Sequence, residues 1–285
     1  MSSGSLAVNT TLLPAKTKAL RRVFLSARWQ LLAMLNWEVD PALLVPFVPP
    51  GLELDLHERK TFVSLVGFLF RDTRLLGIPV PGHCNFEEVN LRFYVRRVVD
   101  GEVRRGVAFI REIVPRWAIA QTARVCYNEP YLALPMQHDV TGPAAALAAG
   151  PAPIECEEPG VRGQKPGGNS RGPGRVAYRW RMQGRWNGLE LEYAGPRLPL
   201  ASGSHEEFIA EHYWGYCGQR RGGTVEYEVV HPRWNIWRAT QASLDCSAAA
   251  ALYGPQLAQV LSAAPTSAFL ADGSPIAVLK PARIR

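Results

Sequence analysis

Three polar side chains recur at every second position of one otherwise apolar stretch. Glu88, Asn90 and Arg92 alternate with aliphatic and aromatic residues between Phe86 and Val99. Successive side chains of a strand point to opposite faces, so the pattern predicts a strand with one apolar face and one face of hydrogen-bonding groups. A carboxylate, an amide and a guanidinium spaced about 7 Å apart along a strand can orient a small polar ligand. Glu88 and Arg92 are therefore candidate catalytic residues, and Asn90 is a candidate ligand-binding residue.

A purely structural role for the same residues carries equal weight. Glu88 and Arg92 could pair with each other, or with Arg124, as a buried ionic network that serves only the fold. One variant distinguishes the two interpretations. Removing the Arg92 side chain abolishes ligand binding without unfolding the protein in the first case, and unfolds it in the second.

An imidazole next to a large aromatic ring forms a second candidate group. The segment His231-Pro232-Arg233-Trp234 lies at a predicted strand junction. His231 is a candidate ligand-binding residue or general base, and Trp234 is a candidate wall for an aromatic ligand. A histidine at such a bend also commonly serves as a structural hydrogen-bonding residue. Arg28, near the start of the predicted fold, is a candidate clamp for a charged ligand.

The sequence contains no recognised metal or nucleotide motif. His205 and His212 are seven positions apart, nearly two helical turns, which is too far for one ion without a further element. The group His83, Cys84 and Glu87 has no recognised ligand spacing. The phosphate-binding glycine loops, the G-x-S-x-G nucleophile motif and the H-E-x-x-H zinc motif do not occur. We therefore expect no metal and no cofactor.

The composition is that of an ordinary globular protein. The 285 residues are 47% hydrophobic and 20% charged, which supports a sizeable core without a metal or disulfide. The five cysteines form no C-x-x-C pair, a usage typical of reduced thiols. The sequence has neither a long apolar run nor a signal-peptide pattern. We expect a cytoplasmic protein without a membrane partner.

The positive net charge does not by itself indicate nucleic-acid binding. The charge of +7 comes from 27 arginines and five lysines scattered along the chain, without the interleaved aromatic residues of a base-stacking platform. Such a distribution supplies nonspecific phosphate affinity rather than a site. We expect a small-molecule ligand and no nucleic acid as the partner, and a homo-oligomer is compatible with the sequence.

Turn and capping residues divide the chain into short elements. A helix begins at Asp40-Pro41, and a turn at Asp100-Gly101 joins the polar strand to a second strand, Glu102 to Ile113. Ser204 to Glu207 form a capping box that opens a helix continuing to Tyr213. Helical spacing predicts another helix over Pro115 to Tyr127. Further strands are predicted over residues 52–57, 61–70, 175–182, 189–193, 224–230, 234–239 and 276–279, with helix or loop over 255–263.

Several strands with few short helices, and without regular βαβ alternation, predict an α+β, mainly antiparallel and barrel-like fold around a pocket. Residues 1–22 are predicted to be a flexible N-terminal segment and residues 23–285 a single domain. A Gly- and Pro-rich stretch around 141–175 is predicted to be a surface excursion of that domain.

Motifs spread over most of the chain, from about Arg28 to Ala239, follow one another in a recognisable order. In that order the chain resembles the YqjF-like family, an uncharacterised bacterial domain of unknown function in the acetoacetate decarboxylase-like superfamily. The motifs are Arg28-Trp29, Pro49-x-Gly51-Leu52-Glu53, Phe86-x-Glu88-x-Asn90-x-Arg92-x-Tyr94-Val95, Gly106-Val107-x-Phe109, Ala123-Arg124 with Tyr127-Asn128-Glu129-x-Tyr131, and His231-Pro232-x-Trp234.

The resemblance implies a cone-shaped, double-layered β-barrel with a central cavity lined by the strand of Glu88. In the decarboxylases, an Ala-Arg pair leads through a turn to Pro-Lys, and this lysine forms a Schiff base with the substrate. Here Pro130 is followed by Tyr131, which cannot form an imine. The resemblance places Arg124 and Glu129 beside the cavity as ligand-binding residues, with Arg124 able to hold a carboxylate, and makes Tyr131 a candidate hydrogen-bond donor or general acid.

The sequence therefore favours a cavity that binds a small carboxylate or aromatic metabolite. If the protein is an enzyme, which the sequence leaves open, it would perform lyase- or hydrolase-type acid-base chemistry without a Schiff base. One alternative is a non-catalytic binding or interaction protein whose cavity is filled by its own side chains. Another is a Schiff-base decarboxylase or lyase with a displaced lysine, Lys60 or Lys280.

Overall fold

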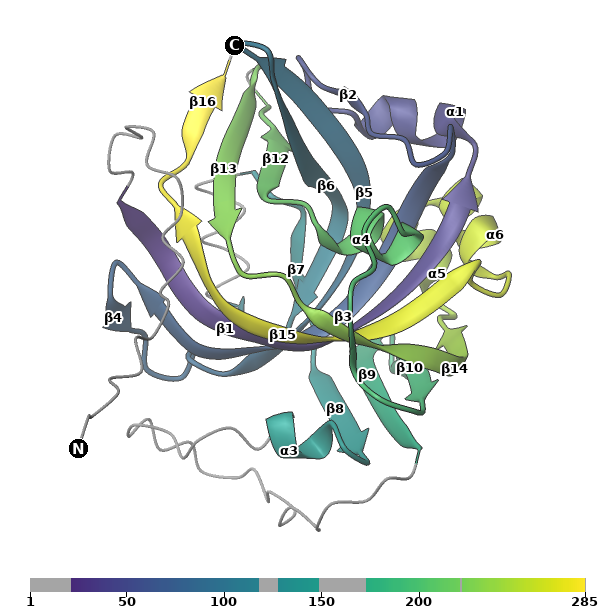
Figure 1. The fold of residues 1–285 in the computed structure, drawn as a ribbon. Coiled ribbons are helices and arrows are strands. Elements are labelled where there is room, and N and C mark those ends of the chain that lie inside the picture. The colour runs from purple at the N-terminus through teal and green to yellow at the C-terminus, as the bar shows by residue number, and fades with distance from the viewer. Residues whose placement is uncertain (1–21, 118–127, 149–172, 221, 285) are drawn as a thin grey trace, which may run out of the picture.

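The computed structural model describes residues 22–117, 128–148, 173–220 and 222–284. Within them the strands form one hydrogen-bonded, mainly antiparallel sheet, and the helices are short (Figure 1). The helices are α1 (Pro41–Leu44), the 3-10 helix η1 (Val45–Phe47), α3 (Ala145–Ala148), α4 (His205–Ala210), α5 (Ala249–Tyr253) and α6 (Pro255–Leu261). The strands are β1 (Val23–Val39), β2 (Glu53–Leu54), β3 (Thr61–Leu75), β4 (Ile78–Pro79), β5 (Phe86–Val99), β6 (Glu102–Val114), β7 (Tyr131–Ala133), β8 (Met136–Thr141), β9 (Gly174–Met182), β10 (Arg185–Tyr193), β11 (Leu198–Pro199), β12 (Trp214–Gly218), β13 (Thr224–Val230), β14 (Asn235–Asp245), β15 (Ser267–Leu279) and β16 (Ala282–Ile284).

Part of this sheet closes into a ring. The strands β13, β12, β6, β5, β3, β1 and β15 are neighbours in this order, and a pairing of Val229 in β13 with Val278 in β15 completes the circle. Closure pairs the backbone groups that an open sheet would leave at its edges. The inner face of this ring, visible in Figure 1, is where a pocket can form.

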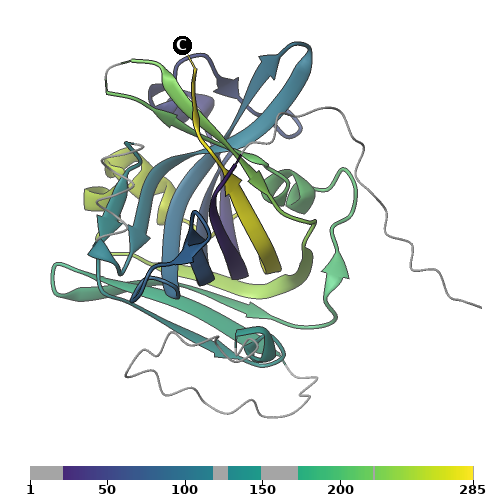
Figure 2. The same ribbon diagram turned by 90° about the vertical axis from the view of Figure 1, so that its left-hand side faces the viewer.

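A second layer covers one outer side of the ring. The sheet continues from β15 through β14, β10, β9 and β8, which pass beneath the ring in Figure 2. The two layers touch closely at Gly67 of β3, where an added Cβ atom would lie 2.5 Å from the ring of Tyr178 in β9. The contact explains the small residue at this position, and β3 is buried on both faces from Thr61 to Phe70.

Strand β1 was not predicted, because the first element identified in the sequence was the helix that begins at Asp40. Its segment Leu31–Leu35 is almost completely buried, because one face lines the ring interior and the other contacts the second layer. A strand buried on both faces shows no alternation of polar and apolar residues, so the period-two signal is lost.

A bulge in β1 changes the direction of its side chains. Leu31 has a φ of 55°, and the pairing with β3 shifts between Gln30 and Ala33. On β15 the partner of Gln30 is Gly273, with a φ of 84°, where a Cβ atom would lie 2.1 Å from the carbonyl oxygen of Trp29. After the extra residue, Leu32 faces the ring interior as Trp29 does.

The turn and cap predictions are confirmed where they rest on local chemistry. The Asp40 side chain accepts a hydrogen bond from the Ala42 amide at the start of α1, and Ser204 accepts one from the Glu207 amide at the start of α4. Asp100 and Gly101 both have positive φ, as a two-residue hairpin turn requires.

Other boundaries differ from the sequence prediction. Helix α4 ends at Ala210 rather than Tyr213, because β12 begins at Trp214 and pairs with β6. The strand expected over 52–57 is reduced to β2, which pairs with β5 and not with β3. The strands predicted over 224–230 and 234–239 are neighbours in sequence but not in the sheet: β13 pairs with β12, β16 and β15, and β14 pairs with β15 and β10.

Some predictions fall on residues that the structure does not describe. They are the N-terminal segment, most of the helix expected over Pro115 to Tyr127, and the middle of the Gly- and Pro-rich excursion. Among the described residues, no helix is both long enough and apolar enough to cross a membrane.

Candidate functional site

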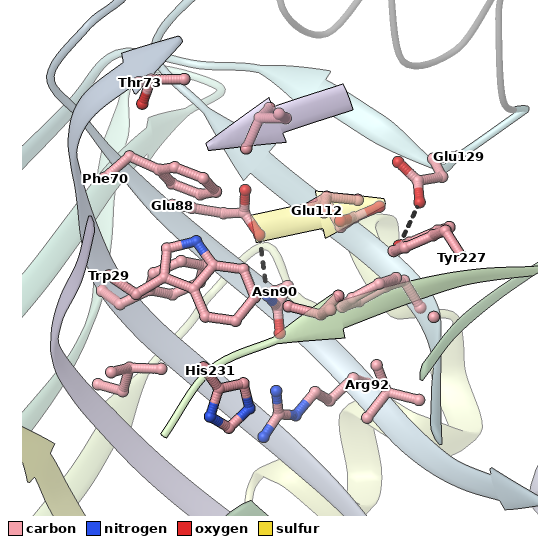
Figure 3. A pocket seen from close by; sticks show the side chains of 18 of the residues that line it. Trp29, Phe70, Thr73, Glu88, Asn90, Arg92, Glu112, Glu129, Tyr227 and His231 are labelled. Atoms are coloured by element: carbon pink, nitrogen blue, oxygen red, sulfur yellow. Dashed lines mark hydrogen bonds between the residues drawn. The ribbon is translucent and has the colours of Figure 1, made fainter. Parts of the chain in front are cut away.

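The ring encloses a cavity of about 310 Å³. This volume suits a small metabolite, and the open space differs from a cavity filled by the protein's own side chains. Aromatic residues from several strands form much of the wall, among them Trp29, Phe68, Phe70, Phe86, Phe109 and Trp234. The polar or ionisable side chains that line it are Thr73, His83, Glu88, Asn90, Arg92, Glu112, Glu129, Tyr131, His212, Tyr227 and His231, of which Figure 3 labels eight.

Glu88 is held on β5 by two hydrogen bonds. Its Oε1 accepts from Nδ2 of Asn90 at 2.9 Å and its Oε2 accepts from the Tyr131 hydroxyl at 3.1 Å. Burial raises the pKa of Glu88 to about 7; the neighbouring Glu129 carboxylate acts in the same direction, and the two hydrogen bonds and Arg92 oppose it. A carboxyl group with a pKa near neutrality can both accept and return a proton.

Two further carboxyl groups lie near Glu88. Glu129, directly before β7, accepts a hydrogen bond of 2.6 Å from the Tyr227 hydroxyl, and burial raises its pKa to about 7. Glu112 on β6 is directly opposite Asn90 in the sheet, and no described residue forms a hydrogen bond with its Oε2. Burial, followed by the charges of Glu129 and Glu88, raises the pKa of Glu112 well above its usual range. The unliganded cavity therefore holds three carboxyl groups that resist simultaneous ionisation.

Arg92 is a buried cation without an ion-pair partner in the described chain. Its side chain is 8% exposed, one terminal nitrogen donates to the Ile209 carbonyl oxygen at 3.3 Å, and Nε has no partner among the residues that the structure describes. Figure 3 shows its guanidinium beside His231, with Asn90 between it and Glu88. Glu88 and Arg92 therefore do not form the ion pair that a purely structural role would require. The other pairing considered, with Arg124, involves a residue outside the described ranges.

Tyr131 occupies the position after Pro130 and lines the cavity from β7. Burial and the surrounding carboxylates Glu112, Glu88 and Glu129 raise its pKa well above the usual range, so it stays a phenol that donates to Glu88. Tyr131 and Glu88, both candidate catalytic residues from the sequence, are therefore in direct contact.

His231 and Trp234 form an aromatic group at the cavity wall. Their rings stack with centroids 4.2 Å apart, and Trp29 lies at 6.3 Å from Trp234. His231 contacts the Pro232 carbonyl oxygen through Nδ1 at 2.9 Å, and burial lowers its pKa, so it is neutral near pH 7. Both predicted residues line the cavity, and the Trp234 indole also donates to the Ser274 hydroxyl.

Arg28 does not line the cavity. It precedes Trp29 on β1, and adjacent residues of a strand point to opposite faces. The clamp predicted for Arg28 is therefore not part of the pocket. Arg124 falls outside the described residues.

Several residues of the cavity wall were not predicted as site residues, among them Trp29, Glu112, His212 and Tyr227. Glu112 lies in the second strand of the predicted hairpin, but the register set by the Asp100-Gly101 turn would place Arg111 opposite Asn90. A register shift between Leu91 and Arg92 brings Glu112 there instead, so the sequence carried no signal for this residue. Tyr227 comes from β13, far along the chain, and its contact with Glu129 depends on ring closure. His212 is buried beside Asp55 at 3.3 Å, and burial lowers its pKa to about 4.

Neither lysine suggested for a displaced Schiff base lines the cavity. Lys60 lies outside the ring, where it forms an ion pair with Glu38 at 2.8 Å, and Lys280 is exposed. The described residues also contain no cluster of three or more His, Cys, Asp or Glu side chains arranged to hold a metal ion.

The three carboxyl groups predict that stability falls as pH rises. A glutamate whose pKa is 4.5 when unfolded and about 7 when folded binds its proton more tightly in the native state. Its contribution is fully present below pH 4.5 and is lost as pH rises through 7, by roughly 3 kcal/mol for a shift of this size. We expect urea unfolding to show this decline between pH 5 and 8.

The variant Glu112→Gln should flatten that decline, because it removes the repulsion that Glu112 and its neighbours exert on one another. The matched control is Glu87→Gln, since Glu87 on β5 lies outside the cavity and contacts His138 at 2.6 Å. Although burial opposes it, His138 lowers the pKa of Glu87, so this residue stabilises the fold at higher pH. A wild-type profile that rises between pH 5 and 8 would contradict the proton-binding cluster.

Comparison with known proteins points to one family and one fold. The family model of DUF2071, an uncharacterized conserved protein, matches residues 26–275. The uncharacterized protein YqjF of Bacillus subtilis (strain 168) is 29% identical over 117 residues, which cover 41% of this chain and 47% of that protein. The match thus spans about half the length of this curated relative.

Solved structures of similar architecture share little sequence. An acetoacetate decarboxylase from Legionella pneumophila superposes with a TM-score of 0.59 at 12% identity, covering 100% of this chain and 98% of that one. An acetoacetate decarboxylase-like enzyme from Sphingomonas wittichii RW1 has a TM-score of 0.60 at 13% identity, covering 98% and 99%. The enduracididine biosynthesis enzyme MppR, complexed with pyruvate, has a TM-score of 0.56 at 15% identity, covering 99% and 98%. These similarities confirm the predicted fold class, an acetoacetate decarboxylase-like, mainly antiparallel β-barrel.

Proposed function

This chain belongs to the DUF2071 family, and from the geometry of its cavity we propose that it binds a small carboxylate with an apolar or aromatic body and catalyses proton transfer on it without a Schiff base. Arg92 holds the carboxylate. Glu88 acts as the general base, and Tyr131 is the hydrogen-bond donor beside it.

The observation that carries this proposal is the buried Arg92 guanidinium. A cation taken out of water is costly unless an anion or several acceptors compensate it. Among the described residues no carboxylate pairs with Arg92, and its Nε has no acceptor although the side chain borders an open cavity. A ligand carboxylate supplies the missing partner through charge-assisted hydrogen bonds.

The aromatic wall supports an apolar body for the ligand. Trp29 makes edge contacts with Phe68 at 5.4 Å and with Phe70 at 5.9 Å, and all three line the cavity. Such rings exclude water and accept a flat or aliphatic group. The ligand class is therefore an amphipathic carboxylic acid rather than a sugar or a nucleotide.

The Glu88–Tyr131 pair supports proton transfer as the reaction. A ligand that places a carbonyl group at Tyr131 presents its adjacent C–H bond to Glu88. The Glu88 carboxylate takes the proton as the C–H electrons form an enolate, and the enolate oxygen accepts a hydrogen bond from Tyr131. Return of a proton to carbon restores the ligand. The solved neighbour MppR is complexed with pyruvate, which supports 2-oxo acids as the test class.

The test is native mass spectrometry with 2-oxo-4-phenylbutyrate, with and without borohydride. We expect a reversible complex of protein and ligand, and no borohydride-fixed product, because neither Lys60 nor Lys280 lines the cavity. A reduced adduct that maps to any lysine overturns the proposed mechanism in favour of an imine. 4-Phenyl-2-butanone, which has the ring and the ketone without the carboxylate, is the control ligand and should not bind.

A further inference from the structure

The cavity contains unpartnered acceptors as well as the unpartnered donor of Arg92. Oδ1 of Asn90 and Oε2 of Glu112 are buried and accept no hydrogen bond from any described residue. The two side chains are 3% and 2% exposed, and both line the cavity. Two buried acceptors without a donor carry a desolvation penalty that a ligand donor can remove.

These two acceptors are adjacent in space. Asn90 on β5 and Glu112 on β6 are direct cross-strand partners, so their Cβ atoms are separated by about 5 Å. Glu88 and Glu129 lie beside them, and the charges of both raise the pKa of Glu112 after burial does. The other ionisable groups near this region are Tyr131, Tyr227 and the Cys217 thiol, whose pKa burial and the charges of Glu129 and Glu112 raise. Arg92 lies on the far side of Asn90 (Figure 3). We call Asn90, Glu112, Glu88 and Glu129 the acceptor pole.

The acceptor pole and Arg92 are separated along one strand. Asn90 and Arg92 are two residues apart on β5, a distance of about 7 Å. An α-amino acid carries its two charges on neighbouring atoms and cannot bridge this span. A molecule with its charges at opposite ends of a ring or short chain can.

We propose that the ligand is amphoteric, with its carboxylate on Arg92 and an ammonium group, at the opposite end of an apolar body, that donates to Oδ1 of Asn90 and Oε2 of Glu112. This inference rests on the proposed function for the carboxylate end and adds the chemistry of the other end. An ammonium has three donors, enough for both acceptors and one further carboxyl oxygen. Its positive charge also compensates the negative charge of the carboxyl groups when they ionise.

The test is isothermal titration calorimetry with two ligands of the same shape, 4-(aminomethyl)benzoate and 4-methylbenzoate, at pH 7. We expect the wild type to bind the ammonium compound about tenfold or more tightly. In Glu112→Gln this preference should fall to about threefold or less. The control Glu87→Gln should keep it, because Glu87 does not line the cavity.

A second readout needs no variant. An ammonium group favours the ionised form of nearby carboxyl groups, so binding of 4-(aminomethyl)benzoate should release protons, whereas 4-methylbenzoate should release fewer. Titrations in buffers of different ionisation enthalpy count these protons. Equal affinity and equal proton release for both compounds overturn the amphoteric ligand and leave the proposed function standing. If neither compound binds, the proposed function fails as well.

Discussion

The variant Arg92→Met is expected to lose carboxylate binding by about 1,000-fold or more and to remain folded. Two charge-assisted hydrogen bonds in a water-excluded site account for a loss of this size. The fold should tolerate the change, because it removes a buried cation that has no ion-pair partner in the described chain and replaces it with an apolar side chain of similar length. We expect the free energy of unfolding to change by no more than about 1 kcal/mol, reflecting the lost hydrogen bond to Ile209.

The measurement pairs calorimetric titration of 2-oxo-4-phenylbutyrate with urea unfolding. The matched control is Arg71→Met, since Arg71 on β3 is another largely buried arginine but does not line the cavity. This control should bind normally and be less stable, because it removes a positive charge that, together with His138, favours the Glu87 carboxylate. An Arg92→Met protein that unfolds while Arg71→Met does not would favour the structural network over the binding site.

The variant Glu88→Gln is expected to slow proton exchange on a bound 2-oxo acid by about 1,000-fold, within the range typical of a lost general base. Glutamine preserves the size of the side chain but cannot accept the proton at neutral pH. The assay follows the incorporation of deuterium from heavy water into carbon 3 of 2-oxo-4-phenylbutyrate by NMR. Binding should weaken much less than exchange, since Arg92 still holds the carboxylate.

Glu87→Gln again provides the control on the same strand, and its exchange rate should equal that of the wild type. The pH profile supplies a second criterion. Because the pKa of Glu88 is about 7, exchange should rise as pH increases through 7 and then level off. Exchange that is equally fast in wild type and Glu88→Gln would exclude Glu88 as the base.

Local chemistry made parts of the fold predictable. Asp40 before Pro41, Ser204 before Glu207 and the Asp100-Gly101 turn satisfy backbone groups within a few residues, so their signals are complete in the sequence. Strand β5 was predictable for a related reason. Its cavity face is polar and its other face apolar, which preserves the period of two.

Elements that depend on distant partners were harder to predict. β1 has no alternation because both of its faces are buried, and α4 ends early because β12 is recruited to β6 from more than 100 positions away in the chain. The spacing of polar and apolar residues along the chain does not predict such strand pairings. The contacts that stabilise them form only when the ring of strands closes.

The sequence by itself determined the row of Glu88, Asn90 and Arg92, the replacement of a lysine by Tyr131, and the family to which the chain belongs. These are properties of residue type and spacing, and they survive in an unfolded chain. Only the tertiary structure decided that Glu112 faces Asn90 and that Tyr227 donates to Glu129. It also decided that Arg92 is buried with no carboxylate of the described chain paired to it, while Arg28 lies outside the pocket. The physical reason is that ring closure and the β1 bulge set which side chains share one water-excluded space, and burial in that space sets their charge.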